Sequence, residues 1–248
     1  MKNLVLFLVM SQFFFLPLQS QTLKESFETD DVNINIMEEA SRELIYLFED
    51  YNDGIIFYRN QRTVHAKLNY SLLQDIFIVK NPDESLHMLK TNIPFDSIKV
   101  NKENKVFIYR QNQGYYELIE GSTNYYVKHQ TDLAVDEVKR GPFGTTPSSA
   151  KIGSIKPVLV SDFDMGAYSN RGIYMENPVA GIVKINLKYQ PVLTTLVDGQ
   201  PISVTSRREL NRLYPEHRSE IRNFIRSEKT QLDNMNDQIK LAKFLETL

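Results

Sequence analysis

The feature that most constrains the fold is the stretch from Gly54 to His129, where short runs of alternating apolar and polar residues are separated by turn signals. In Thr63–Tyr70 the alternation has the period of two that is typical of a strand with one face in water. The expected strands are Gly54–Tyr58, Thr63–Tyr70, Asp75–Val79, Ser85–Lys90, Ser97–Val100, Lys105–Tyr109, Tyr115–Ile119 and Tyr125–His129. They predict an antiparallel β domain over residues 54–130, a meander that forms either a curled sheet or an open barrel.

Residues 1–20 have the layout of a secretory signal peptide. Lys2 precedes an apolar run from Leu4 to Leu18, and Ser20 supplies a small residue before the expected cleavage site. An N-terminal membrane anchor is the alternative, but the run is shorter than the ~20 residues that span a bilayer. We expect export with removal of the signal peptide, to the periplasm, the outer membrane or the medium. No transmembrane helix is expected in the mature chain.

The composition excludes several functional classes. The chain contains no cysteine, which excludes disulfides, thiol catalysis and zinc sites with Cys ligands. Its formal net charge of −2 argues against a dedicated nucleic-acid-binding protein. The histidines lack the spacing of metal ligands, and the alternation places His65 and His129 on the solvent face. The sequence therefore assigns no catalytic, cofactor-binding or metal-binding residue, and no cofactor is expected.

Residues 21–53 form an acidic N-terminal arm, with ten carboxylates over 22–53. Apolar residues recur at helical spacing from Met37 to Tyr51, and Asn35 is suited to cap a helix there. The arm is interpreted as a short amphipathic helix or an irregular segment that packs on the sheet. A calcium site is the functional alternative, but the acids lack the spacing of a calcium-binding loop.

Several motifs of the β region resemble those of a known group of proteins. They are the aromatic stretch Leu47–Tyr51 before Gly54–Tyr58, the run Ala66–Leu73 with its Leu68-Asn69-Tyr70 step, the apolar Ile76–Ile78, and the later Val106–Ile108 and Tyr116–Leu118. In these motifs the chain resembles a group of uncharacterised secreted proteins from Bacteroidota. The resemblance implies export, a β-rich architecture and a helical C-terminal tail. It supplies no catalytic residue, because no activity is known for that group.

Residues 131–157 are rich in Gly, Pro, Ser and Thr, and their later part is basic. This composition favours turns over regular structure, so a surface loop is expected. The functional interpretation is a binding loop in which Arg140, Phe143 and Lys151 contact an anionic partner. A phosphate-binding P-loop is excluded, since the segment lacks the Gly-Lys-Ser/Thr step that such a loop needs.

Residues 158–204 are expected to add further strands. Asp198-Gly199 between two apolar runs predicts a tight hairpin. Asp162 and Asp164 lie close enough along the chain to act as a pair of catalytic carboxylates, although acids at alternate positions of a loop are more often simply exposed.

Residues 205–248 predict a helical tail, which makes the overall fold class α+β. Ser206 and Glu209 match a capping box, so a helix is expected to begin at Arg207. Pro215 is suited to the first position of a second helix, and a third helix is expected around 237–246.

Three arginines of the second tail helix recur at intervals of four residues: Arg218, Arg222 and Arg226. The functional interpretation is that these arginines bind an anionic partner such as lipopolysaccharide, peptidoglycan or an acidic protein. The structural interpretation is that they form a solvated rim, in which the arginine stems cover apolar surface.

Two functional hypotheses follow from the sequence. The favoured one is a non-enzymatic binding or interaction module for an envelope protein or a glycan. It is supported by the tyrosine pairs Tyr115/Tyr116 and Tyr125/Tyr126, since one ring of each pair is expected to face outward. The alternative is a hydrolase or glycan-processing enzyme, which would place two carboxylates ~5–9 Å apart in an apolar cleft.

Overall fold

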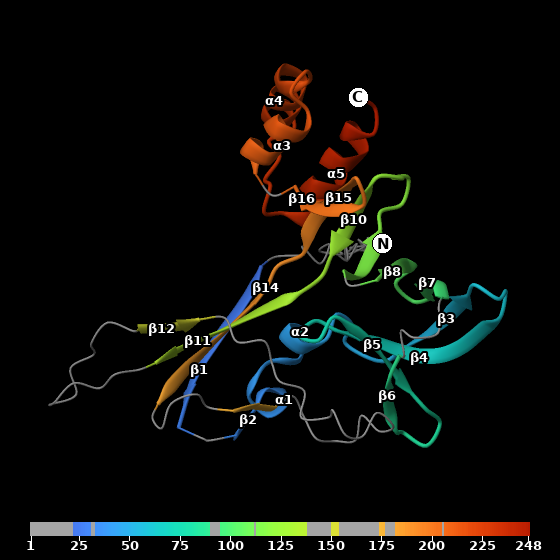
Figure 1. Ribbon diagram of the computed structural model, residues 1–248, viewed down its shortest axis with the longest axis vertical. Helices are drawn as coiled ribbons and strands as arrows, with labels where there is room; N and C mark the ends of the chain where they lie inside the picture. Colours follow the sequence, from blue (N-terminus) through green and yellow to red (C-terminus); the bar gives the residue numbers. More distant parts are fainter. Residues whose placement is uncertain are drawn as a thin grey trace, which may run out of the picture.

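The computed structural model describes residues 22–30, 33–89, 95–111, 113–137, 150–153, 174–176, 182–204 and 206–248. The expected signal peptide lies outside these residues, as do Arg140, Phe143, Asp162 and Asp164. In the described part the strands form three sheets, and the longer helices gather in the C-terminal tail (Figure 1).

The largest sheet has ten strands in the order β16-β15-β10-β9-β8-β7-β3-β4-β5-β6. Their bounds are β3 Asn52–Tyr58, β4 Thr63–Ser71, β5 Ile76–Lys80, β6 Leu86–Met88, β7 Phe95–Val100, β8 Lys105–Arg110, β9 Gly114–Leu118, β10 Tyr125–Lys128, β15 Val192–Val197 and β16 Gln200–Ser203. Neighbouring strands are antiparallel, and β16 and β6 are the two edges, so the sheet is not closed on itself. The α+β fold class with a mainly antiparallel meander is thus confirmed.

The hairpin between β15 and β16 is confirmed as well. Asp198 and Gly199 form its two-residue turn, with Val197 opposite Gln200. Both turn residues have left-handed φ angles, 52° and 75°, as this type of turn requires.

A four-stranded antiparallel sheet lies beside the first. It contains β1 (Leu23–Thr29), β14 (Val183–Tyr189), β11 (Thr131–Glu137) and β12 (Ala150–Gly153) in that order, while β2 (Asn33–Asn35) pairs separately with β13 (Tyr174–Glu176). The interval 131–157, expected as a loop, therefore contains two strands. The reason is local: buried Leu133 and Val135 alternate with more exposed residues, a strand pattern that the Gly/Pro-rich composition of the whole interval obscures.

One long two-stranded ribbon joins the two large sheets. β10 pairs with β15, and beyond the junction residues His129 and Gln130 the chain continues as β11, which pairs with β14. The register is the same on both sides, with Lys128 opposite Val192 and Thr131 opposite Tyr189. In Figure 1 both chains of the ribbon run from the helical end of the molecule into the four-stranded sheet. The junction therefore brings side chains of both sheets to one place.

The acidic arm contains two short helices, α1 (Ile36–Glu39) and α2 (Arg42–Ile45), instead of one helix across 37–51. Asn35 caps α1 as expected, since its Oδ1 accepts the backbone N–H of Met37 at 3.2 Å. Helical structure ends at Ile45 because the next residues pair with the sheet: Tyr46 forms a bridge with Ser71 at the end of β4. Pairing with the sheet thus overrides the helical spacing of the apolar residues.

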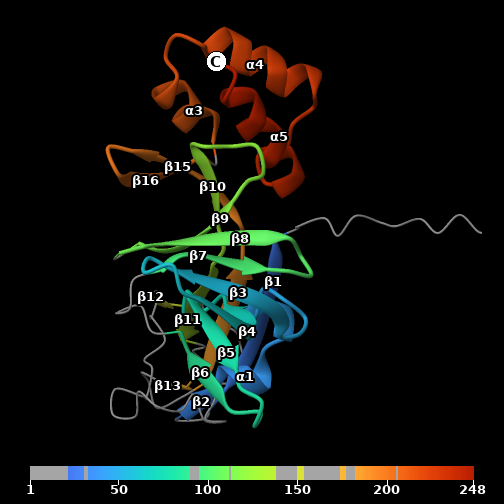
Figure 2. The ribbon, with the colours of Figure 1, turned by 90° about the vertical axis from the view of Figure 1, so that its right-hand side faces the viewer.

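Three helices make up the tail: α3 (Arg207–Leu213), α4 (Arg218–Ser227) and α5 (Met235–Leu245). They lie at the β15 end of the ten-stranded sheet (Figure 2) and share a second hydrophobic core with it, separate from the main core between the sheets and the arm. None of the helices among the described residues is long and apolar enough to cross a membrane.

The first helix boundary of the tail agrees with the sequence and the second does not. Ser206 and Glu209 form a reciprocal capping box, which confirms the start of α3. The next helix begins at Arg218, after His217, so the expectation that Pro215 is its first residue is wrong. The N–H of His217 bonds the carbonyl of Tyr214 at 3.3 Å, so residues 214–217 form a turn before α4 begins.

Candidate functional site

A groove on the helical tail is the best candidate for a binding site. It has a volume of about 440 Å³, within the range of small-ligand pockets. It is formed by α3 and α4 and is lined by Arg207, Leu210, Asn211, Ile221, Arg222, Ile225 and Arg226. The apolar members are buried and close the floor, while the three arginines are exposed at the rim.

The local sequence explains how the arginines are positioned. The capping box sets the start of α3, so that Arg207 is its first residue. In α4, Ile221 and Ile225 turn inward, and the residue after each of them is an arginine that the 3.6-residue period carries to the groove. Arg218 ties the two helices together, since its Nε donates to the backbone carbonyl of Asn211 at 3.1 Å.

The groove is strongly cationic. No Asp or Glu lines it, and the structure gives Arg207, Arg222 and Arg226 no hydrogen bond or ion pair within the described residues. Nearby acids have other contacts: Glu209 belongs to the capping box, and Glu220 lies 3.3 Å from the Nδ1 of His217. The arginine fork matches carboxylates and phosphates. The groove is therefore suited to an anion.

The structure separates the expected arginine stripe into two roles. Arg222 and Arg226 line the groove, whereas Arg218 bonds the backbone of α3 and is not part of the lining. Arg207 completes the groove, and sequence reasoning missed it as a site residue. Arg207 lies in the same groove as the α4 arginines only because α3 packs against α4, and residue spacing along the chain does not predict that packing.

The tyrosine pairs do not form the expected exposed face. Tyr115 and Tyr116 are both buried, as is Tyr125, and Tyr126 is half-buried. The prediction of one outward ring is wrong for the first pair because side chains cover both faces of β9. Tyr115 packs in the aromatic core, and the ring of Tyr116 is covered by Tyr126 and by the ammonium of Lys128, 4.9 Å from its centroid.

The predicted binding loop is described only in part. Arg140 and Phe143 lie outside the described residues. Lys151 lies in β12, opposite Asp136 of β11.

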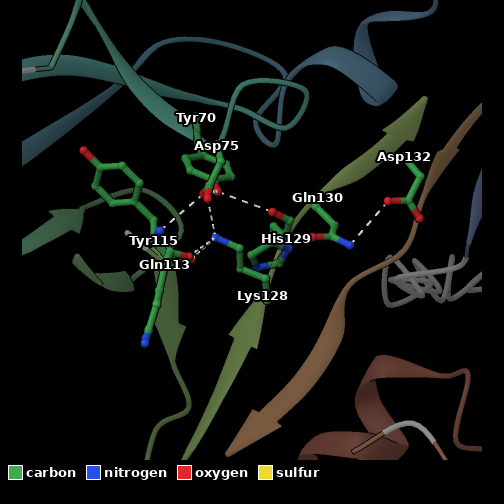
Figure 3. Close-up of polar contacts among 8 residues, drawn as sticks. All are labelled: Tyr70, Asp75, Gln113, Tyr115, Lys128, His129, Gln130 and Asp132. Carbon is green, nitrogen blue, oxygen red and sulfur yellow. Dashed lines mark hydrogen bonds and ion pairs between the residues drawn. The ribbon is translucent and has the colours of Figure 1, made fainter. Parts of the chain in front are cut away.

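A partly buried polar network lies at the junction of the two large sheets. The carboxylate of Asp75 accepts hydrogen bonds from the Tyr70 hydroxyl and, at 3.2 Å, from the backbone N–H of Tyr115. Lys128 Nζ lies 2.5 Å from Asp75 Oδ2 and donates to the carbonyls of Gln113 and Tyr115, each at 3.1 Å (Figure 3). This group ties the turn before β5 to β9 and β10.

A second part of the network is centred on His129. Its Nε2 lies 2.6 Å from Glu117 Oε2, and its Nδ1 lies 2.8 Å from the Tyr189 hydroxyl. Lys105 Nζ contacts both oxygens of Glu117 at 2.6 and 2.7 Å. The expected exposure of His129 is therefore wrong: it is 5% exposed, because β14 and its Tyr189 cover the junction. His65, by contrast, is exposed as expected.

The electrostatics of this network favour a structural role. Burial opposes ionisation of Glu117, but the hydrogen bonds and charges of His129 and Lys105 outweigh it and lower its pKa to about 2. Burial lowers the pKa of His129 and raises that of Tyr189 above the usual value of a phenol. A carboxylate that stays ionised is a poor general acid, and a phenol that stays protonated is a poor nucleophile.

Among the described residues, no three His, Asp or Glu side chains are grouped so that they could hold a metal ion. Comparison with protein-family models, with curated proteins and with solved structures found no match to the chain.

Proposed function

We propose that the protein is an exported, non-enzymatic binding module of the cell envelope that holds an anionic protein or glycan in the groove between α3 and α4. The observation that carries the proposal is a groove of about 440 Å³ lined by three arginines that have no acidic partner among the described residues. Surface arginines usually pair with acids or lie scattered in water. Their convergence on one concave site favours recognition of an anion.

The division of the molecule supports the same proposal. The sheets and the arm share one core, and the tail helices share another with the β15 end of the ten-stranded sheet. The β region serves as the scaffold, and the tail presents the contact site. The enzyme alternative gains no support from Asp75 and Glu117, because each of these partly buried carboxylates is held by a lysine.

Binding to immobilised polymers tests the proposed function. We expect the chain without residues 1–20 to be retained on a carboxylated polysaccharide such as alginate or on a Glu-rich peptide, and to pass through neutral dextran. Retention should weaken as the salt concentration is raised from about 50 to about 200 mM, because salt screens the attraction between surface charges. The double variant Arg222→Ala/Arg226→Ala should lose retention.

The matched control removes the same charge from the same tail outside the groove. Arg208→Ala/Arg212→Ala should be retained like the unmodified chain, because neither arginine lines the groove. If both double variants lose retention equally, only the net charge of the tail matters, and the groove is not the site.

Export is tested separately by N-terminal sequencing of the protein from fractionated cells. We expect the envelope or medium fraction to contain a chain that begins at Gln21, after cleavage behind Ser20. A chain that begins at Met1 in the cytoplasmic fraction would contradict export.

A further inference from the structure

The spacing of the arginines limits the size of the charged group that the groove takes. Arg222 and Arg226 are one turn apart, or about 6 Å along α4, and α3 is only about 10 Å long. Arg207, the first residue of α3, lines the same groove. All three side chains thus line one groove of about 440 Å³, a volume that suits a single charged group and the small molecule that carries it.

The number of donors distinguishes between the common anions. Each guanidinium offers five N–H donors in a planar fork. A carboxylate has two oxygens and one negative charge, which one arginine satisfies with a bidentate contact. A phosphate monoester has three terminal oxygens and a charge of about −1.5 to −2 at neutral pH, so three converging arginines match it better.

The floor of the groove limits what is attached to that group. Leu210, Ile221 and Ile225 are 0, 2 and 4% exposed, so they already pack in the tail core and offer little apolar surface to an acyl chain. The rest of the ligand must extend away from the floor into water, which suits a sugar better than a lipid tail.

We infer that the groove recognises a phosphate monoester, carried by a phosphorylated sugar or glycan, through the forks of Arg207, Arg222 and Arg226. This inference rests on the proposed function and narrows its ligand to one chemical class. In the absence of ligand, the three arginines destabilise α4, because Arg218, Arg222 and Arg226 are like charges four residues apart on one helix. Binding of a doubly charged anion would relieve that repulsion.

Titration calorimetry with small probes at constant ionic strength tests the inference. We expect glucose 6-phosphate to bind, glucuronate to bind about tenfold more weakly, and glucose not to bind. Inorganic phosphate shows whether the sugar contributes to binding. If it binds as tightly as glucose 6-phosphate, the phosphate alone is recognised. If glucose 6-phosphate binds more tightly, the sugar contributes. Equal binding of glucuronate and glucose 6-phosphate would overturn the inference.

Substitutions at Arg222 separate binding from folding. Arg222→Glu should abolish phosphate binding without lowering the melting temperature, because the new acid pairs with Arg218 and Arg226 at i−4 and i+4. Arg222→Lys keeps the charge but lacks the fork, so its affinity should fall about fivefold or more. The control Arg212→Glu makes the same charge change outside the groove and should bind like the unmodified chain.

The outcomes also separate this inference from the proposed function. If the carboxylated polymers are retained through Arg222 and Arg226 and the phosphate probes do not bind, the proposed function stands and the phosphate inference is wrong. If neither polymers nor phosphate probes bind, both are wrong. Undiminished phosphate binding by Arg222→Glu would place the phosphate site elsewhere on the chain.

Discussion

The Nε2 of His129 lies 2.6 Å from Oε2 of Glu117 at the point where the chain passes from the ten-stranded sheet into the four-stranded one. With Nδ1 accepting from the Tyr189 hydroxyl, a neutral imidazole that donates from Nε2 satisfies all three groups. This tautomer is assigned from the hydrogen-bond network. The junction is thus held by a polar chain that a neutral histidine completes.

The first prediction concerns the pH dependence of stability. Burial lowers the pKa of His129 in the folded state, so the unfolded chain binds the proton first as pH falls below about 6.5. The free energy of unfolding should therefore decrease below that pH, by at most about 1.4 kcal/mol per pH unit for one proton. His129→Gln should be less stable at pH 7 but should lose this slope in urea titrations between pH 7.5 and 5.

His65→Gln is the control, because it removes an exposed histidine of β4 that is not part of the junction network. Glu117 acts in a lower pH window: its folded pKa of about 2 lies below its usual 4.5, so its contribution is lost as pH falls from 4.5 toward 2. A slope between pH 7.5 and 5 that persists in His129→Gln would contradict the proposed role of this histidine.

The second prediction concerns Gly114, which allows Asp75 and Lys128 to approach the backbone of β9. Its φ is +83°, and a Cβ there would lie 1.7 Å from Asp75 Oδ2 and 2.6 Å from Lys128 Nζ. Gly114→Ala should therefore cost the left-handed penalty of about 1–2 kcal/mol and roughly 1–3 kcal/mol more for displacing the ion pair. Urea unfolding measures both contributions together.

Gly121 provides the matched control, since its φ of +80° is nearly the same and nothing lies within 4 Å of a Cβ there. Gly121→Ala should cost only the left-handed penalty of about 1–2 kcal/mol. Equal losses in the two variants would show that the contact with Asp75 and Lys128 contributes nothing beyond the backbone strain.

The sequence predicts the strands of the large sheet well because their alternation reflects a local property, one apolar face in a hairpin-connected meander. The sequence predicts burial poorly where another segment of the chain packs on the polar face of a strand. Asn69 and His129 occupy polar positions of their strands, yet they are 0% and 5% exposed. The arm covers the first and β14 covers the second. Neither contact leaves a local signal in the sequence.

The candidate site shows the same limit. The spacing of Arg222 and Arg226 predicts that they share one face of a helix, and the structure agrees. That Arg207 lines the same groove depends on the packing of α3 against α4. The same packing brings Arg218 to the backbone carbonyl of Asn211 and keeps it out of the groove lining. Charge spacing therefore identifies a cationic helix face, but only packing turns that face into a groove.

The third prediction concerns Asn69, in the Leu68-Asn69-Tyr70 step. Its side-chain amide accepts from the N–H of Phe48 at 3.2 Å and donates to the carbonyl of Phe48 at 2.9 Å, which holds the arm against β4. Asn69→Asp keeps the acceptor, loses the donor and buries a charge, so it should cost at least about 2 kcal/mol at pH 7. The loss should shrink at low pH, where a protonated carboxyl can donate again.

The control for this substitution is Asn60→Asp, where the exposed amide oxygen only accepts the N–H of Arg62 at 3.1 Å. A carboxylate keeps that bond, so the change should stay within about 0.5 kcal/mol. A similar loss of stability in both variants would contradict the role assigned to the Asn69 donor.

The last prediction concerns Glu246, which fastens the end of the helical tail to the turn between β9 and β10. Its Oε1 accepts from the Ser122 hydroxyl at 2.6 Å and from the N–H groups of Thr123 and Asn124 at 2.8 and 2.7 Å. Slight burial opposes its ionisation, but these hydrogen bonds lower its pKa to about 2. The fastening should therefore persist down to about pH 4.5 and be lost as pH falls toward 2.

Glu246→Ala removes the acceptor and should accelerate hydrogen exchange at the amides of Thr123 and Asn124, because both N–H groups then face water. The global loss should be only about 1 kcal/mol, since the carboxylate is only partly buried and water can replace its hydrogen bonds. Glu216→Ala, an exposed acid before α4, should change neither measurement. If exchange at Thr123 and Asn124 is the same in all three chains, the tail is held to the sheet by its apolar core alone.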